Sequence, residues 1–213
     1  PYTIFPILAL FCNIIVVSGN CFNYIRAGNL NLKILKFYLI GSIPFAFIGG
    51  LITIDKRIFE ILLFFVLATA GILLLLNFKS YNDEKTIYKK TSKVISIFIG
   101  ALIGFISGIV GIGGGIFLSP ILFLLRGGKA QHIVTTASLF ILINSISGIA
   151  GHLTKNNILN EFSNYWYLIF AVFIGGQIGN FLNLKIISSR ILALITSILV
   201  IFVTIRLGLK IFN

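Results

Sequence analysis

Acidic residues, cysteine, histidine and methionine are scarce in this 213-residue chain, which has five Asp and Glu, two Cys, two His and no Met. These few side chains form no cluster with the spacing of metal ligands, so no metal site is expected. Cys12 and Cys21 fall on opposite faces of one predicted helix, which excludes a disulfide between them. An enzyme would need a nucleophile with a base, paired carboxylates or a metal. None is visible, and the sequence predicts neither catalysis nor a cofactor.

The chain is instead rich in apolar residues: 58% of its residues are hydrophobic and only 10% are charged. This composition excludes an ordinary soluble domain and indicates a multi-pass protein of the cell membrane, with the lipid bilayer as its surroundings. The apolar stretches are too long and continuous for barrel strands, so the expected fold class is all-α. The net charge of +12 comes from bases that lie mainly in short loops. They indicate membrane topology, and no nucleic-acid partner is expected.

The predicted architecture is a polytopic transmembrane helical bundle of about seven membrane segments, all but the fourth close to the length that spans a bilayer. In order, these segments are Thr3–Ile25, Ile34–Thr53, Ile58–Leu76, Val94–Leu125, Ile133–Leu153, Tyr165–Leu184 and Ile191–Ile211.

The fourth segment is the feature around which the rest is organised, because it is longer than one span and carries its own break. The break consists of Gly111, Gly113, Gly114 and Gly115. Glycine costs roughly 1 kcal/mol relative to alanine inside a helix, so four within five positions predict an interruption. We expect a helix from Val94 to Val110, then an irregular segment. A short helix should follow, starting between Ile116 and Pro120, with Ser119 as N-cap and Pro120 at its first position.

Irregular backbone at membrane depth is tolerated where protein buries it or where it lines a polar cavity. A half-helix that starts there directs free N–H groups and a positive dipole end toward an anion. Transporters hold their substrates at such broken helices. The alternative is plain helix packing, which we accept for Gly100, Gly104 and Gly108. A dinucleotide loop is excluded, since no strand precedes the glycines.

The chain also repeats itself, since SGNCFNYIRAGNL at 18–30 aligns without a gap on SGIAGHLTKNNIL at 147–159. This predicts a first repeat over residues 1–76, a basic cytoplasmic loop over 77–93 and a second repeat over 94–213. The first repeat lacks its opening glycine-motif helix, which either lies upstream of Pro1 or is absent. Counts of Lys and Arg place the basic loop in the cytoplasm but leave open whether Val94–Leu125 crosses the membrane or re-enters on one side.

Polar side chains inside the segments are the candidates for substrate contacts, because burying them in lipid is costly. For any one of them, hydrogen bonding between helices is the alternative. His152 is expected either as a solvated interfacial side chain or as a proton relay, and Glu60 is expected to pair with Lys56 or Arg57. The predicted substrate-binding residues are Gly111, Gly113, Gly114, Gly115, Ser119, Pro120, Thr136, Ser138, Asn144, Ser18 and Asn20.

The motif GFISGIVGIGGGIFLSPILFLL at 104–125 resembles the sulfite exporter TauE/SafE family of membrane permeases. Its GxxGxGGGxxxxP pattern is matched by residues 108–120, and Thr135, Thr136, Ser138 and Leu139 are similar to a further family segment. The resemblance covers essentially the whole chain. It implies export of small anions, often sulfur-containing ones such as sulfite or organosulfonates. Family members usually have about eight membrane segments with a glycine motif in each half, and this chain has one motif.

The sequence therefore predicts a permease for small oxyanions that works by alternating access between two related halves. The alternative is a membrane subunit that does not transport, including a truncated or degenerate permease. A second glycine motif upstream would favour transport. Substrate identity, coupling ion and direction stay open, and so does the oligomeric state, a homo-oligomer included.

Overall fold

The computed structural model describes residues 4–26, 28, 32–77, 92–125, 130–154, 165–185 and 189–212. Over these ranges the chain forms eight helices, and the predicted all-α class is confirmed. They are α1 (Phe5–Arg26), α2 (Leu32–Leu51), α3 (Lys56–Asn77), α4 (Lys93–Val110), α5 (Gly115–Leu124), α6 (Ala130–Leu153), α8 (Trp166–Lys185) and α9 (Ser189–Phe212). The predicted basic loop lies almost wholly outside the described residues.

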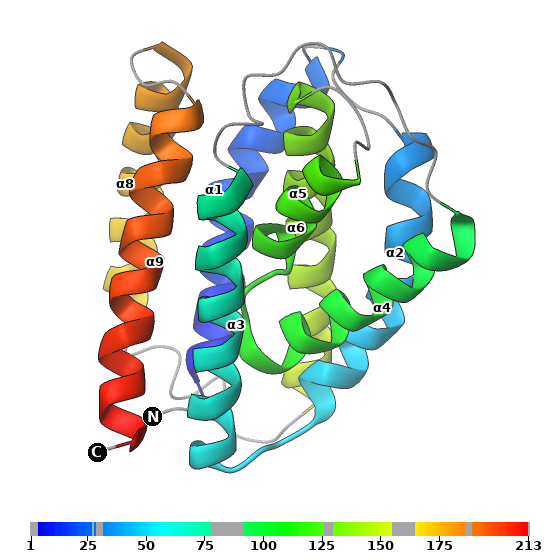
Figure 1. The fold of residues 1–213 in the computed structure, drawn as a ribbon. Helices are drawn as coiled ribbons and strands as arrows, with labels where there is room; N and C mark the ends of the chain where they lie inside the picture. Colours follow the sequence, from blue (N-terminus) through cyan, green and yellow to red (C-terminus); the bar gives the residue numbers. More distant parts are fainter. Residues whose placement is uncertain are drawn as a thin grey trace.

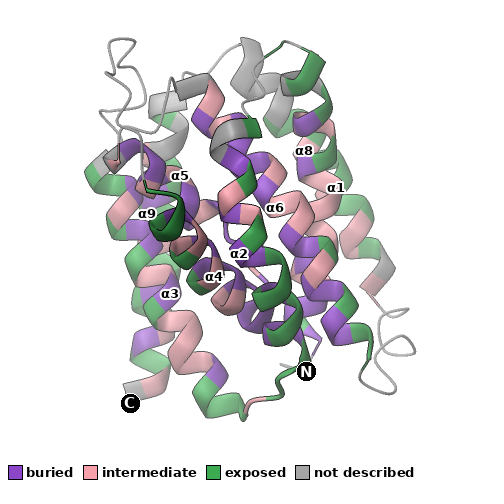
Figure 2. Cartoon of the chain, turned by 90° about the vertical axis from the view of Figure 1, so that its right-hand side faces the viewer, coloured by how far each residue is buried: buried purple, intermediate pink, exposed green. Residues whose placement is uncertain are grey.

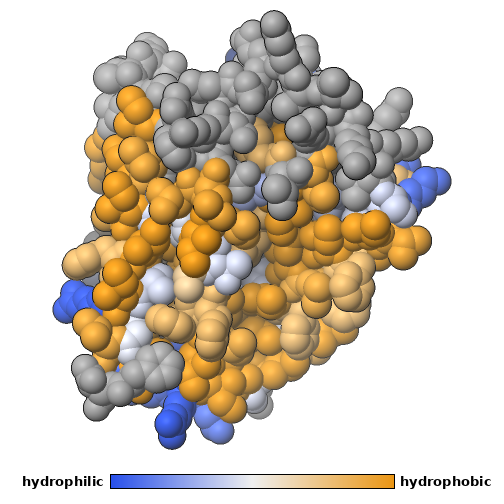
Figure 3. Space-filling model, in the orientation of Figure 1, coloured by the Kyte–Doolittle hydropathy of each residue, from blue (hydrophilic) through white to orange (hydrophobic). Residues whose placement is uncertain are grey.

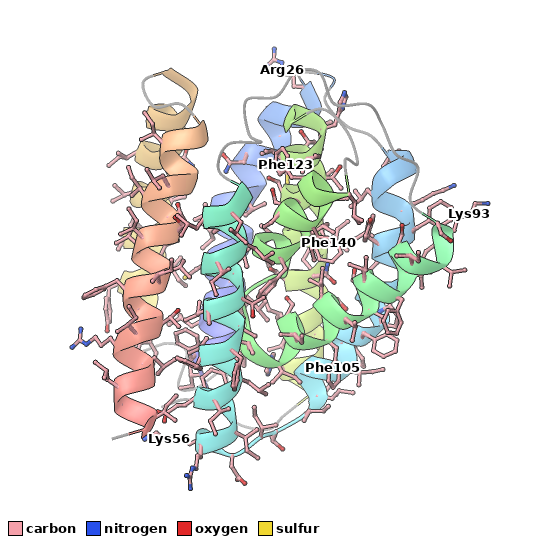
Figure 4. The ribbon with its side chains drawn as sticks, viewed as in Figure 1. Arg26, Lys56, Lys93, Phe105, Phe123 and Phe140 are labelled. Carbon is pink, nitrogen blue, oxygen red and sulfur yellow. The ribbon has the colours of Figure 1, made fainter. Side chains whose placement is uncertain are left out.

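Five of these helices are long and apolar enough to cross a membrane: α1, α3, α4, α6 and α9. The apolar parts of α2 and α8, Leu35–Leu51 and Tyr167–Gly179, are shorter. Hydrophobic side chains cover the face seen in Figure 3, and hydrophilic ones lie at its rim. Arg26 and Lys56 lie at opposite ends of the bundle (Figure 4). This distribution suits helices surrounded by lipid, with charged ends at the two surfaces.

Glycines set the close packing of α2 on α4. A Cβ on Gly104 would lie 2.7 Å from the Cα of Ser42, and one on Gly108 would lie 3.0 Å from the backbone N of Gly50. Gly100 meets the backbone of Tyr38 in the same way. Because contacts advance along both helices in the same direction, α2 and α4 run parallel. The packing role predicted for the three glycines of α4 is confirmed.

The helix α6 lies against the other side of α2 and along α1. The hydroxyl of Ser147 donates a 2.7 Å hydrogen bond to the carbonyl of Ile43, and Gly151 packs on the backbone of Gly50. A Cβ on Gly148 would lie 3.0 Å from a methyl of Leu10. Buried residues gather on α4, α5 and α6 (Figure 2), so the centre of the molecule is the junction of these helices with α1 and α2.

Two predictions about helix ends and pairs are wrong. The helix α5 begins at Gly115, and Gly114 is its N-cap, so Ser119 caps nothing and Pro120 lies inside the helix. Glu60 accepts a 3.0 Å bond from Lys210 of α9, because α3 and α9 pack side by side and bring this distant lysine to it.

Candidate substrate-binding site

The connection between α4 and α5 is a non-helical segment, residues 111–114, which we call the glycine segment. Gly111, Gly113 and Gly114 have φ values of +84°, +77° and +76°. This is the left-handed region, in which a side chain is strained and glycine is not. The glycines thus allow the chain to leave α4 at Val110 and to start α5 within a few residues.

Polar side chains of two other helices meet the glycine segment at Gly113. A Cβ on this residue would lie 2.9 Å from Nδ2 of Asn13 on α1 and 3.1 Å from Oγ of Ser145 on α6. It would also lie 2.8 Å from Cγ2 of Ile141. The amide of Asn13 donates a 3.5 Å hydrogen bond to the carbonyl of Gly111. An amide of α1 and a hydroxyl of α6 therefore reach the same stretch of backbone.

Gly114, at the start of α5, is enclosed by α4 and α6. A Cβ there would lie 2.7 Å from Cγ2 of Ile103, 2.9 Å from Cε1 of Phe140 and 3.5 Å from Cβ of Ser107. Phe140 lies near the centre of the bundle in Figure 4. No side chain of the described residues caps α5. The first N–H groups of a helix lack an intrahelical partner, so the buried start of α5 offers donors to a ligand.

Three buried polar atoms of α4 and α6 lack a hydrogen-bond partner among the described residues: Oγ of Ser107, Oδ1 of Asn144 and Oγ of Ser145. At most 1% of each of these residues is exposed. A buried polar atom without a partner costs about 1–3 kcal/mol, so a group that supplies the partners would be bound favourably. We call Asn13, Ser107, Asn144 and Ser145 the polar cluster.

The polar cluster lies in a part of the chain without fixed charge. Residues 5–25, 94–125 and 130–154 contain no Lys, Arg, Asp or Glu. In the part of the chain that the structure describes, no group of His, Cys, Asp and Glu could hold a metal ion. Any anion held here would be bound by hydroxyl, amide and backbone N–H donors and by the positive end of α5.

The other predicted site residues lie at different positions. Thr136 is buried, and its hydroxyl donates a 2.7 Å bond to the carbonyl of His132 within α6. Ser138 is also buried on α6. Ser18 is exposed and donates to the carbonyl of Ile15. Asn20 has a buried Oδ1 without a partner in the described structure, two helical turns beyond the polar cluster along α1.

Two further predicted residues belong to α5 but not to its first turn. Ser119 is half-buried and Pro120 is buried inside the helix. His152 is only 3% exposed, which corrects the expectation of a solvated interfacial side chain. Its ring approaches the end of α4, where its Nε2 lies 2.8 Å from the carbonyl oxygen of Gly108.

Of the polar cluster, sequence reasoning selected only Asn144 as a site residue. Asn13 and Ser145 are two of many polar residues inside the predicted segments, and Ser107 is not among the predicted site residues. One signal could have identified Ser107: it lies one turn before the first glycine of the break, and its carbonyl accepts the N–H of Gly111 at 2.8 Å. The positions of Asn13 and Ser145 depend on tertiary contacts between helices.

Comparison with known proteins identifies relatives along nearly the whole chain. Residues 1–207 match the family described as sulfite exporter TauE/SafE. The chain is 27% identical to the probable membrane transporter protein y4hK of Sinorhizobium fredii over 90% of this chain and 77% of that protein. It is 27% identical to a probable membrane transporter protein of Methanocaldococcus jannaschii over 70% of this chain and 55% of that protein. With YunE of Bacillus subtilis it shares 23% identity over 83% of this chain and 70% of that protein. No solved structure matches.

Proposed function

Because the chain belongs to the sulfite exporter TauE/SafE family, we propose that it transports small oxyanions, above all sulfur-containing ones such as sulfite and organosulfonates. The family is one of membrane transporters, not of enzymes, and the chain is a multi-pass membrane protein. The proposal concerns the substrate, its site and the way in which it moves.

The single observation that carries the proposal is the start of α5, which no side chain of the described residues caps, beside the polar cluster. Oγ of Ser145 lies against Gly113 and Cβ of Ser107 lies against Gly114. Neither hydroxyl has a partner among the described residues, and Asn13 adds an amide donor. A small oxyanion would accept from these groups and from the first N–H groups of α5. We therefore assign substrate contacts to the glycine segment, to Gly115 and to the polar cluster.

We propose that α4, the glycine segment and α5 form one broken membrane element that enters and leaves on the same side. In Figure 1, α4 descends to the glycine segment and α5 turns back upward. Such an element places irregular backbone and the start of a half-helix inside the protein, away from lipid. Of the two topologies that charge alone left open, this is the re-entrant one.

Helix directions support two inverted repeats, in which α1, α2 and α3 correspond to α6, α8 and α9. The helices α1 and α6 run antiparallel, since Leu10 contacts Gly148 while Asn13 and Ser145 meet at Gly113. The helices α3 and α9 also run antiparallel: Glu60 bonds Lys210, and Gly71 faces Ile201. These are the pairings that a two-fold axis in the membrane plane produces. The repeats would then be 1–76 and 94–213, joined by the loop 77–93.

Transport would proceed by alternating access, with Ile141 among the groups that move. Its side chain contacts the positions of Gly113 and Gly115 and so covers the backbone that would face the anion. Gly113 and Gly115 are both buried in this conformation. A change that moves α6 relative to the broken element would uncover it on one side of the membrane.

The test is flux of radiolabelled sulfite, thiosulfate, sulfate and taurine in proteoliposomes that contain the purified chain. Movement of at least one anion above the rate in empty liposomes is the expected result. If folded protein moves none of them, the alternative of a membrane subunit without transport takes the place of this proposal. Folding is checked in the same samples by circular dichroism and thermal unfolding.

A further inference from the structure

The position of Asn144 on α6 indicates which protonation state of the substrate the site binds. This inference rests on the function proposed above. Asn144 lies one turn after Phe140, which contacts Gly114. It also lies one turn before Gly148, where an added Cβ would be 3.7 Å from Cα of Gly108. Residues four apart share a helix face. Asn144 therefore faces the end of α4 and the glycine segment, between these two contacts.

The orientation of the Asn144 amide is fixed by one hydrogen bond. Its Nδ2 donates to the carbonyl oxygen of Phe140 at 2.8 Å. The flipped amide would place Oδ1 against that carbonyl, and two acceptors cannot bond. The atom left over is thus Oδ1, which only accepts. It is buried and has no partner in the described part of the chain.

The neighbouring polar groups have the opposite character. The hydroxyls of Ser107 and Ser145 can each donate a proton outward, as can the amide of Asn13 and the first N–H groups of α5. The polar cluster thus offers several donors and, at Asn144, one isolated acceptor. A ligand that satisfies all of them must accept at several oxygens and donate at one.

Charge favours the same ligand. No Lys or Arg occurs in residues 5–25, 37–54, 61–77, 94–125 or 130–154, and the ring of His152 on α6 is bonded to the carbonyl of Gly108. Dipoles of these helices therefore compensate the charge of a bound anion. The cost of removing an ion from water rises steeply with its charge, and dipoles offset one unit far more readily than two. A monoanion is favoured over a dianion.

We propose that the polar cluster selects singly protonated oxyanions, whose one O–H donates to Oδ1 of Asn144 while the remaining oxygens accept from Ser107, Ser145 and α5. Hydrogen sulfite is the test case among sulfur oxyanions. The fully deprotonated dianion carries excess charge and has no proton for Asn144. An alkylsulfonate of the same charge leaves the Asn144 acceptor unpaired, and unpaired buried groups are the strongest basis of discrimination.

The experiment compares hydrogen sulfite with methanesulfonate, a monoanion without an O–H, in the same proteoliposomes. In the wild type we expect a preference for hydrogen sulfite of about tenfold or more, and a sulfite rate that falls as rising pH removes the proton. Asn144→Leu should abolish the preference, so that the ratio of hydrogen sulfite flux to methanesulfonate flux falls by about tenfold or more. Asn144→Thr, whose hydroxyl can donate to the Phe140 carbonyl and still accept, should retain part of the preference.

Other outcomes separate the two proposals. If Asn144→Leu lowers both rates equally, or changes neither, the selection of protonated anions is wrong while transport itself stands. The same holds if wild type moves sulfite equally well when it is deprotonated. If wild type moves no anion, the proposed function fails and this inference fails with it. Matched thermal unfolding midpoints for the three proteins exclude loss of folding as the cause.

Discussion

The carbonyl oxygen of Gly108 accepts a 2.8 Å hydrogen bond from Nε2 of His152, which joins the last turn of α4 to the end of α6. Since a carbonyl only accepts, Nε2 carries the hydrogen in this contact. The bond lies three residues before the glycine segment and is buried. It therefore holds the end of α4 at the place where the chain stops being helical.

We expect His152→Leu to destabilise the protein by about 1–3 kcal/mol, because it leaves the Gly108 carbonyl buried without this donor. His152→Gln, which keeps an N–H donor on a side chain of similar length, should recover part of the loss. The free energy of unfolding in detergent micelles measures both. Equal stability of His152→Leu and wild type would show that the bond does not anchor α4.

Gly104→Ala should cost about 1–3 kcal/mol, the range for overpacked sites. The new Cβ would lie 2.7 Å from Cα and 2.9 Å from the carbonyl carbon of Ser42, and backbone atoms cannot rotate away. The matched control is Gly179→Ala on α8, where nothing described lies within 4 Å of the added Cβ. Thermal unfolding midpoints should fall for the first variant only. If both variants shifted the midpoint by a similar amount, helix propensity and not packing on α2 would account for the change in stability.

Glu60→Gln removes the ion pair between α3 and α9 and should change stability by less than about 1 kcal/mol. The Lys210 side chain is 64% exposed, and exposed pairs gain little net energy. Unfolding measured at low and high salt checks this, since any contribution should shrink as salt rises. A loss of several kcal/mol would show that this bond, and not the apolar contacts between α3 and α9, holds the two helices together.

Ile141→Ala should favour larger anions over smaller ones. The wild-type side chain lies against Gly113 and Gly115, so its removal leaves space beside the backbone that we assign to the substrate. The ratio of taurine flux to sulfite flux in proteoliposomes should rise, by about threefold or more if the removed methyl groups set the size limit. Leu139→Ala is the control, because Leu139 lies on the same helix, is partly buried and packs against the hydrophobic core. This variant should leave the ratio unchanged.

Much of this fold follows from residue pattern alone. The end of α4 at Val110 is where the sequence places it, because the next residues include glycines that can adopt positive φ. The packing of Gly100, Gly104 and Gly108 could be predicted because small residues four apart share one helix face. Both are local properties that a single stretch of sequence carries.

The start of α5 and the composition of the polar cluster could not be predicted in the same way. Ser119 and Pro120 have the chemistry of a helix start, but glycine at positive φ caps α5 four residues earlier. Asn13 meets Gly111 across 98 residues of chain, and nothing in the α1 sequence indicates that contact. Local propensity identifies candidate site residues, whereas tertiary packing determines which of them come into contact.

The most direct test of the central claim, that an anion binds where the glycine segment meets Asn13 and Ser145, is the concentration dependence of sulfite flux in three proteins. These are the wild type, the double variant Asn13→Leu and Ser145→Ala, and the control Thr204→Ala, whose buried hydroxyl bonds the carbonyl of Val200 on α9. We predict that the double variant folds but has a KM raised by about tenfold or more, since it loses two substrate donors. The control should match the wild type. An unchanged KM in the folded double variant would place the substrate elsewhere.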